Sequence, residues 1–239
     1  MTDNDSATGK AMPKAVARPP KGAPQSLPLP RGQLVLVGCG AFAVTQLPNL
    51  AVVLRRWYGC RIRACLTDAG SRLVARDALA AATGSPVWGP HWPTDQGMVP
   101  HKELADWADM VIVAPATANF VAKAAHGIAD SLALSVVTGT AAPVFVAPAY
   151  SEHAFARPST ARNLRLLEEE GYHVVPTERA VSVHNGRVAE GGMASMTSLL
   201  GFIGRVTSTM DGGDEPRGEG PARAGHGLDE EGARVDGTR

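Results

Sequence analysis

Four short stretches of this 239-residue chain place small or polar residues directly after an apolar run. They are GCGAFA (38–43), TDAGS (67–71), APATAN (114–119) and APAYSEHAF (147–155). Small residues allow backbone N–H groups to approach a ligand closely, and a helix that starts there presents its first N–H groups to an anion. If the apolar runs are parallel strands, these stretches meet beyond the carboxyl ends of the sheet. The residue types there suit a flat or phosphorylated ligand.

The first stretch matches the loose GxGxxA pattern of dinucleotide-binding turns, which also occurs in tight turns that bind no ligand. The second apolar run ends in Thr67 and Asp68. A hydroxyl at that place suits a phosphate or a ribityl chain better than the ribose diol of NAD. The candidates for binding a phosphate in the first turn are Gly38, Cys39, Gly40, Ala41 and Phe42.

Apolar runs alternate with helical patterns along the middle of the chain. Strands are expected at 33–38, 61–67, 86–88, 110–115, 142–149 and 172–176. Helices are expected at 41–59 with a bend at Pro48, at 68–84, at 100–108, from 117, at 158–171 and at 195–208, with a loop or hairpin near 186–193. Continuous apolar strands that are each followed by a helix predict an α/β fold, a single Rossmann-like (flavodoxin-like) doubly wound parallel sheet with helices on both faces.

Composition limits the class of protein. The chain has 44% hydrophobic residues, enough for one core at 32–210, whereas the Pro-, Ala- and Lys/Arg-rich segment 1–31 and the Gly- and charge-rich segment 211–239 are expected to be disordered tails. Lys and Arg number 23, as do Asp and Glu, which argues against nucleic acid or an anionic membrane as a partner. Only three cysteines, no metal-ligand spacing, no signal peptide and no membrane-length apolar run favour a cytoplasmic protein without a metal.

Several segments together resemble the homo-oligomeric flavin-containing cysteine decarboxylases. APATANFVAKAAHGIADSL (114–132) resembles the PASANT-type segment of this family, and VPHKELADWADM (99–110) resembles its His-x-x-Leu-x-x-x-Ala-Asp segment. Residues 143–176 resemble its PAMNxxMW segment with the helix and strand that follow, and order and spacing match from 33 to about 195. The resemblance is greatest to the peptidyl-cysteine decarboxylases of lanthipeptide- and thioamitide-type peptide biosynthesis.

The resemblance implies FMN as the cofactor. The 114–119 turn would lie against the isoalloxazine ring, where bulky side chains would collide with it, and the first turn and Thr67 would lie near the phosphate and ribityl chain. Ala41 stands where the family commonly has Ser, and Phe120 and Ser131 replace a usual Thr and Asn, so the contacts of those three residues are not carried over. The residues implied to contact FMN are Gly38, Cys39, Gly40, Ala41, Phe42, Thr67, Pro115, Ala116, Thr117, Ala118, Asn119 and Asp130.

The resemblance also implies the catalytic and substrate-binding residues. His101 matches the family's active-site His in the His-x-x-Leu-x-x-x-Ala-Asp segment. An imidazole near neutral pH can accept a thiol proton or hold a thiolate. Without the resemblance, a surface His near a helix start is the simpler interpretation. In the 147–155 loop Ser151 takes the place of the family's substrate-binding Asn, so either Ser151 and Tyr150 share that task or the substrate is held differently. The implied catalytic residues are His101, Asn119 and Ser151, and the implied substrate-binding residues are Tyr150, Ser151, His153 and Met193.

The family's reaction begins with the thiol of a C-terminal cysteine. The flavin accepts a hydride from Cβ, the resulting thioaldehyde acts as an electron sink, and loss of CO2 gives an enethiol or enethiolate. Coenzyme A enzymes of the family reduce this product with the help of a Cys in a late flap, but the matching residues 182–196 contain none. All three cysteines precede residue 66. We therefore expect oxidative decarboxylation of a precursor peptide that ends in Cys, feeding S-aminovinyl-cysteine formation, with O2 reoxidising the flavin.

The resemblance also implies the partners, which are the precursor peptide, further copies of the chain in a trimer or dodecamer, and other enzymes of the same biosynthesis.

Other interpretations remain open at this point. Phosphopantothenoylcysteine decarboxylase of coenzyme A biosynthesis is the first alternative. A flavin prenyltransferase-like enzyme is another, and the altered 147–155 loop supports a non-catalytic flavoprotein subunit. A plain NAD-binding protein would leave three of the four segments unexplained.

Overall fold

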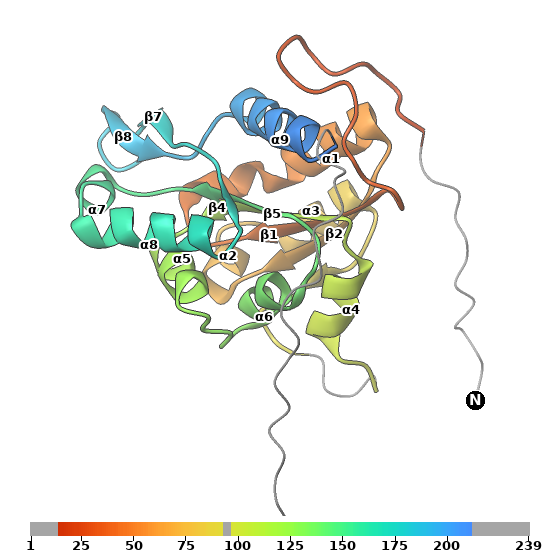
Figure 1. Cartoon of the computed structure of the whole chain (residues 1–239), viewed down its shortest axis with the longest axis horizontal. Coiled ribbons are helices and arrows are strands. Elements are labelled where there is room, and N and C mark those ends of the chain that lie inside the picture. The colour runs from red at the N-terminus through yellow and green to blue at the C-terminus, as the bar shows by residue number, and fades with distance from the viewer. Residues whose placement is uncertain (1–13, 93–96, 212–239) are drawn as a thin grey trace, which may run out of the picture.

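The central element of the fold is a six-stranded parallel sheet, seen in the computed structural model, which describes residues 14–92 and 97–211 (Figure 1). The strand order is β3-β2-β1-β4-β5-β6, and each neighbouring pair is parallel. The strands are β1 (Gln33–Gly38), β2 (Arg61–Leu66), β3 (Val87–Trp88), β4 (Met110–Ala116), β5 (Val144–Pro148) and β6 (His173–Val174).

Both faces of the sheet are covered by helices, because the side chains of each strand alternate between two cores. On β1, Leu34 and Leu36 belong to one core and Val35 and Val37 to the other. The first core is covered by α1 (Leu47–Tyr58), α3 (Arg76–Thr83) and α9 (Met196–Asp211), and the second by α4 (Pro100–Trp107), α5 (Ala118–Ala125), α6 (Leu132–Gly139) and α8 (Pro158–Glu169) (Figure 1). The predicted doubly wound parallel fold is therefore confirmed.

Two predicted helices differ from the structure in their extent, and the helix predicted from 117 is followed by a separate helix that was not predicted. The expected bend at Pro48 is instead the start of α1, after a 3-10 helix η1 (Phe42–Gln46). Proline is tolerated in the first turn because the N–H group that it lacks would have no partner within the helix there. The expected helix 68–84 is divided into α2 (Asp68–Ser71) and α3. Gly70 packs so closely on β1 that a Cβ there would lie 2.5 Å from the carbonyl oxygen of Gly38, which holds α2 against the strand end.

The helix expected from 117 ends at Ala125, and α6 starts after Ser131, whose hydroxyl accepts a hydrogen bond from the Leu134 N–H.

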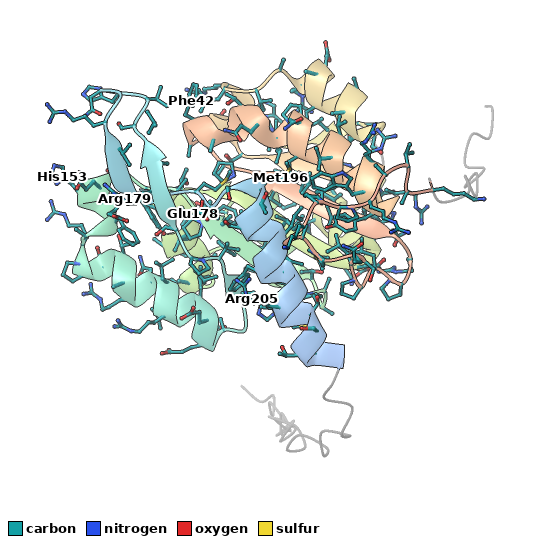
Figure 2. All side chains as sticks on the ribbon, turned by 90° about the horizontal axis from the view of Figure 1, so that it is seen from above. Phe42, His153, Glu178, Arg179, Met196 and Arg205 are labelled. Atoms are coloured by element: carbon teal, nitrogen blue, oxygen red, sulfur yellow. The ribbon has the colours of Figure 1, made fainter. Side chains whose placement is uncertain are left out.

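The segment near 186–193 is a hairpin, formed by the antiparallel strands β7 (Glu178–Val181) and β8 (Val188–Gly192). The Glu178 carboxylate accepts a hydrogen bond of 2.9 Å from the Ser195 N–H, which ties the hairpin to the start of α9 (Figure 2). Hydrogen bonds from Ser198 and Ser195 hold the pKa of Glu178 below its ordinary value. On the other side, the Tyr150 N–H donates to the Gly191 carbonyl at 2.8 Å, just before α7 (Glu152–Phe155).

Residues 14–31 pack on the fold, so the predicted disordered tail over 1–31 is wrong for this part. Ala23 is buried in the first core, and the Tyr58 hydroxyl donates to the Pro24 carbonyl at 3.0 Å. The Val16 N–H donates to the Arg56 carbonyl at 2.8 Å. Residues 1–13, and the C-terminal tail beyond the last residue of α9, lie outside the described residues. Among the described helices none is both long and apolar enough to cross a membrane.

Candidate functional site

The carboxyl ends of the central strands meet at one edge, as the sequence predicts. The Gly38 carbonyl accepts a hydrogen bond of 3.0 Å from the Thr67 N–H, and the Cys39 N–H donates to the Pro115 carbonyl at 3.1 Å. The ends of β1, β2 and β4 are thereby joined directly. β5 continues this edge because it pairs with β4 as far as Ala116.

Packing within the protein leaves little room for side chains at Gly38 and Gly40 of the first turn. A Cβ on Gly38 would lie 2.8 Å from the side chains of Val44, Leu47 and Leu66, and a Cβ on Gly40 would overlap that of Ala69. Gly40 therefore has no room for a larger residue whether or not a ligand binds, and a larger residue at Gly38 would require its neighbours to shift. The sequence pattern alone could not separate this requirement from that of a phosphate.

The side chains of the first turn differ in exposure. Cys39 is buried, and burial raises the pKa of its thiol to about 12, so the thiol stays protonated and faces the core. Gly40 and Ala41 are half-buried. Phe42 is 57% exposed at the periphery of the molecule (Figure 2). A ligand at this turn would therefore meet backbone groups and the Phe42 ring.

A cavity of about 390 Å³ opens beside the end of β2. This volume lies within the range of small-molecule sites. It brings together Thr67 and Asp130, two residues predicted to contact the cofactor, and adds Pro90, His91 and Trp92 from the loop after β3. The sequence did not indicate this loop because it follows no helical or strand period. The other residues that line the cavity are Leu66, Asp68, Ser131, Leu132 and Ala133.

Charges at the mouth of the cavity are balanced. Asp68 pairs with Arg72 at 2.6 Å, and Asp130 pairs with Lys123 at 2.5 Å. All four side chains are partly or largely exposed, so each pair contributes little to stability. Because both carboxylates have a cation beside them, the cavity can accept hydroxyl and amide groups without a large unpaired negative charge.

His101 lies next to this cavity. It is the second residue of α4 and is half-buried. Its ring meets the Trp92 ring edge to face, with centroids 5.3 Å apart and an interplanar angle of 69°. The His101 Nδ1 atom is buried and has no hydrogen-bond partner among the described residues. A titratable ring therefore stands behind a wall of the cavity with one nitrogen unpaired.

The 114–119 turn is ordered by a helix cap. Pro115 and Ala116 are buried in β4, and the Thr117 hydroxyl accepts a hydrogen bond of 3.4 Å from the Phe120 N–H at the start of α5. Ala118 and Asn119 are exposed in the first turn of that helix. The turn therefore presents a small side chain and one amide at the edge where the strands end, but it does not line the cavity beside β2.

The predicted substrate residues are spread over two places. Tyr150 is half-buried with its hydroxyl in the protein interior, and burial raises its pKa; no described residue is a hydrogen-bond partner of this hydroxyl. Ser151 and His153 are exposed on α7 and just before it, with His153 at the periphery (Figure 2). Met193 lines a separate groove of about 60 Å³ between α1 and the start of α9. The single chain does not bring these residues to the cavity that contains Thr67.

The chain resembles known proteins over most of its length. The sequence profile of the flavoprotein family matches residues 23–208. Over 137 residues the chain is 33% identical to the coenzyme A biosynthesis bifunctional protein CoaBC of Bacillus subtilis, which covers 55% of this chain and 34% of that protein. The chain thus spans about a third of the length of the curated relatives it matches.

Solved structures share the fold over most of the chain. The FMN-dependent cysteine decarboxylase SpaF is 30% identical with a TM-score of 0.62, over 74% of this chain and 97% of that one. A PPC decarboxylase variant complexed with pantothenoylaminoethenethiol is 26% identical with a TM-score of 0.65, over 74% of this chain and 98% of that one. The family inferred from the sequence resemblance is confirmed. The expected flavin-dependent enzyme class and the expected cofactor, FMN, agree with these relatives.

Proposed function

The chain belongs to the flavoprotein family, and on this basis we propose that it binds FMN and oxidatively decarboxylates the C-terminal cysteine of a precursor peptide. The observation that supports the proposal is the contact of His101 with Trp92, because Trp92 lines the same cavity as Thr67 and Asp130. His101 is thus one ring contact away from the lining of the cavity, and its buried Nδ1 has no hydrogen-bond partner among the described residues.

The residues present fit FMN. The cavity beside β2 has the volume of a small-molecule site and carries hydroxyl, carboxylate and aromatic groups on its wall. Thr67 and Asp130 would hold polar groups of the ligand there, and the backbone of the first turn would hold its phosphate. Asn119, exposed at the start of α5, would donate to the ring or to the substrate. When bound, FMN supplies the acceptor for two electrons from the cysteine Cβ.

The side chains of the protein handle the proton and the substrate carboxylate. His101 would accept the thiol proton, which makes the sulfur electron-rich before oxidation. The Ser151 hydroxyl makes no side-chain cap bond with α7 and is exposed, but it lies away from this cavity in the single chain. It would donate to the peptide carboxylate where a neighbouring copy of the chain completes the site. That hydrogen bond would orient the carboxylate until it leaves as CO2. The remaining peptide would carry an enethiol or enethiolate at its new end.

A second candidate is phosphopantothenoylcysteine decarboxylation. The likeness to CoaBC and to PPC decarboxylase favours it. Against it stands the absence of a cysteine from residues 182–196, where the resemblance to coenzyme A enzymes implies one. The three cysteines of the chain are buried at Cys39, Cys60 and Cys65.

Mass spectrometry of short peptides ending in Cys, incubated in air with the purified protein and FMN, tests the proposal. Phosphopantothenoylcysteine serves as the parallel substrate. We expect the peptide to lose the mass of one CO2 and two hydrogens. Decarboxylation of phosphopantothenoylcysteine alone would establish the second candidate instead, and no change in either substrate from an FMN-loaded protein would sink both.

Replacing His101 tests its role. In the His101→Asn variant we expect FMN to stay bound and turnover to fall about 100-fold or more, because general acid–base groups contribute about 10²–10⁴ to rate. Flavin absorbance after gel filtration and single-turnover peptide assays give the two readouts. His173→Asn is the matched control, since His173 lies in the edge strand β6 and its ring packs on Phe145 of β5. Equal turnover in the two variants would remove His101 from the mechanism.

A further inference from the structure

The start of the loop after β3, residues 89–92, is anchored to the sheet by two contacts that the sequence pattern does not indicate. The Arg76 guanidinium donates to the carbonyl oxygens of Val87 and Gly89. Gly89 has a φ of +68°, and a Cβ there would overlap the carbonyl oxygen of Leu66 at the end of β2. Only glycine meets both requirements. Residues 89–92 are therefore held against the carboxyl end of β2, at the mouth of the cavity.

Trp92 extends from this anchored loop to two places. Its side chain lines the cavity beside Thr67, and its ring meets the His101 ring edge to face at 5.3 Å. Edge-to-face geometry at this separation is a preferred arrangement of aromatic pairs, because the positive edge of one ring faces the negative face of the other. Trp92 is 39% exposed, so part of the indole is free to contact a ligand.

His101 needs such a contact because its own hydrogen bonds do not fix its ring. In many enzymes the second nitrogen of a reactive His is held by a carbonyl or carboxylate, which sets its tautomer and orientation. Here Nδ1 is buried without a partner in the described part of the chain. Packing must therefore set the ring orientation, and Trp92 provides the aromatic part of that packing.

We propose that Trp92, held by Arg76 and Gly89, is a positioning residue for His101 and the aromatic wall of the ligand cavity. The proposal rests on the proposed function, because positioning matters only if His101 acts in turnover. A change of orientation of the His101 ring, however, can be measured without turnover. The two ideas can therefore fail separately.

The test compares Trp92→Ala and Trp92→Phe, with Trp57→Phe on the other face of the sheet as the control. In 1H–13C spectra of histidine-labelled protein, assigned with the His101→Asn variant, we expect the His101 ring resonance to move in Trp92→Ala. In Trp92→Phe the resonance should stay close to its wild-type position, and in Trp57→Phe it should not change. In peptide turnover we expect kcat to fall about tenfold or more in Trp92→Ala with KM changed by less, because misplaced groups cost rate rather than binding. Trp92→Phe should restore most of kcat.

The outcomes separate the alternatives. An unmoved His101 resonance in Trp92→Ala overturns the proposal, and so does a raised KM with unchanged kcat, which would make Trp92 a binding wall only. If the wild-type protein turns over no peptide, the proposed function fails, and the resonance alone then decides whether Trp92 positions His101. Thermal melting of each variant shows that the comparison is made on folded protein.

Discussion

At the scale of single residues, the His-x-x-Leu-x-x-x-Ala-Asp segment contains three structural positions besides His101, the residue proposed to act in turnover. Leu104 and Ala108 are buried in the second core. The Asp109 carboxylate, with a side chain only 3% exposed, accepts hydrogen bonds from the N–H groups of Arg31 and Gln33 and from the Arg31 side chain. Only His101 contacts Trp92, which lines the cavity. A resemblance that spans the whole segment therefore does not assign function to each of its members.

Removing the Asp109 carboxylate should be costly for this reason. In Asp109→Ala the Arg31 and Gln33 N–H groups lose a charged acceptor, and we expect the free energy of unfolding to fall by about 2–3 kcal/mol. Urea denaturation followed by circular dichroism measures it. Asp106→Ala is the matched control, because among the described residues the exposed Asp106 carboxylate pairs only with Lys102 one turn away, and its loss should cost about 0.5 kcal/mol or less. Similar losses in both variants would contradict this account.

At the scale of elements, α9 is joined to the N-terminal segment by glycines. A Cβ on Gly204 would lie 2.8 Å from the Cβ of Pro24, and one on Gly201 would lie 2.9 Å from the Gly22 carbonyl oxygen. This close approach buries Ala23 and brings Leu27 and Leu29 against the first core. The N-terminal segment is thus part of the fold, and it supports the helix that follows the β7–β8 hairpin.

Gly204→Ala tests this packing. Alanine in an open helix position gains about 1 kcal/mol over glycine, but overlap with the Pro24 ring should cost about 1–3 kcal/mol, so we expect a net loss of stability. Trypsin should also cleave faster after Lys21 as the segment loosens. Gly139→Ala near the end of α6, where a Cβ meets open space, should be neutral or stabilising. A Gly204→Ala protein as stable and as protease-resistant as Gly139→Ala would argue against the contact.

The sequence predicted the strands and the layers better than the helix ends, for a physical reason. Continuous apolar runs such as 110–115 must be buried on both faces, and that requirement alone places them in a parallel sheet. Residues 14–31 pack on the fold instead because Gly201 and Gly204 of α9, far away along the chain, leave room for Gly22 and Pro24. Likewise, the contact of Trp92 with His101 depends on Arg76 and on the positive φ of Gly89. Such contacts between distant segments leave no periodic pattern, so only the structure shows them.

At the scale of the whole molecule, the three thiols sit in the two cores as uncharged groups. Burial raises the pKa of Cys39, Cys60 and Cys65 to about 12 in each case. In the unfolded chain a cysteine ionises near pH 8.5. The folded state therefore binds these protons more tightly than the unfolded state. The stabilisation they give is complete below about pH 8.5 and is lost as the pH rises toward 12.

We therefore expect the free energy of unfolding to fall steeply above about pH 9, by about 1.4 kcal/mol per pH unit for each thiol and about 4 kcal/mol for all three. Urea denaturation under reducing conditions at about pH 8, 9 and 10 measures this slope. In Cys60→Ala the absolute stability changes for reasons of packing, but the slope should become about one third smaller because one titrating group is gone. An unchanged slope in this variant would mean that the alkaline limit of the fold is set elsewhere, with the Tyr58 hydroxyl, whose pKa burial also raises to about 12, as the next group to replace.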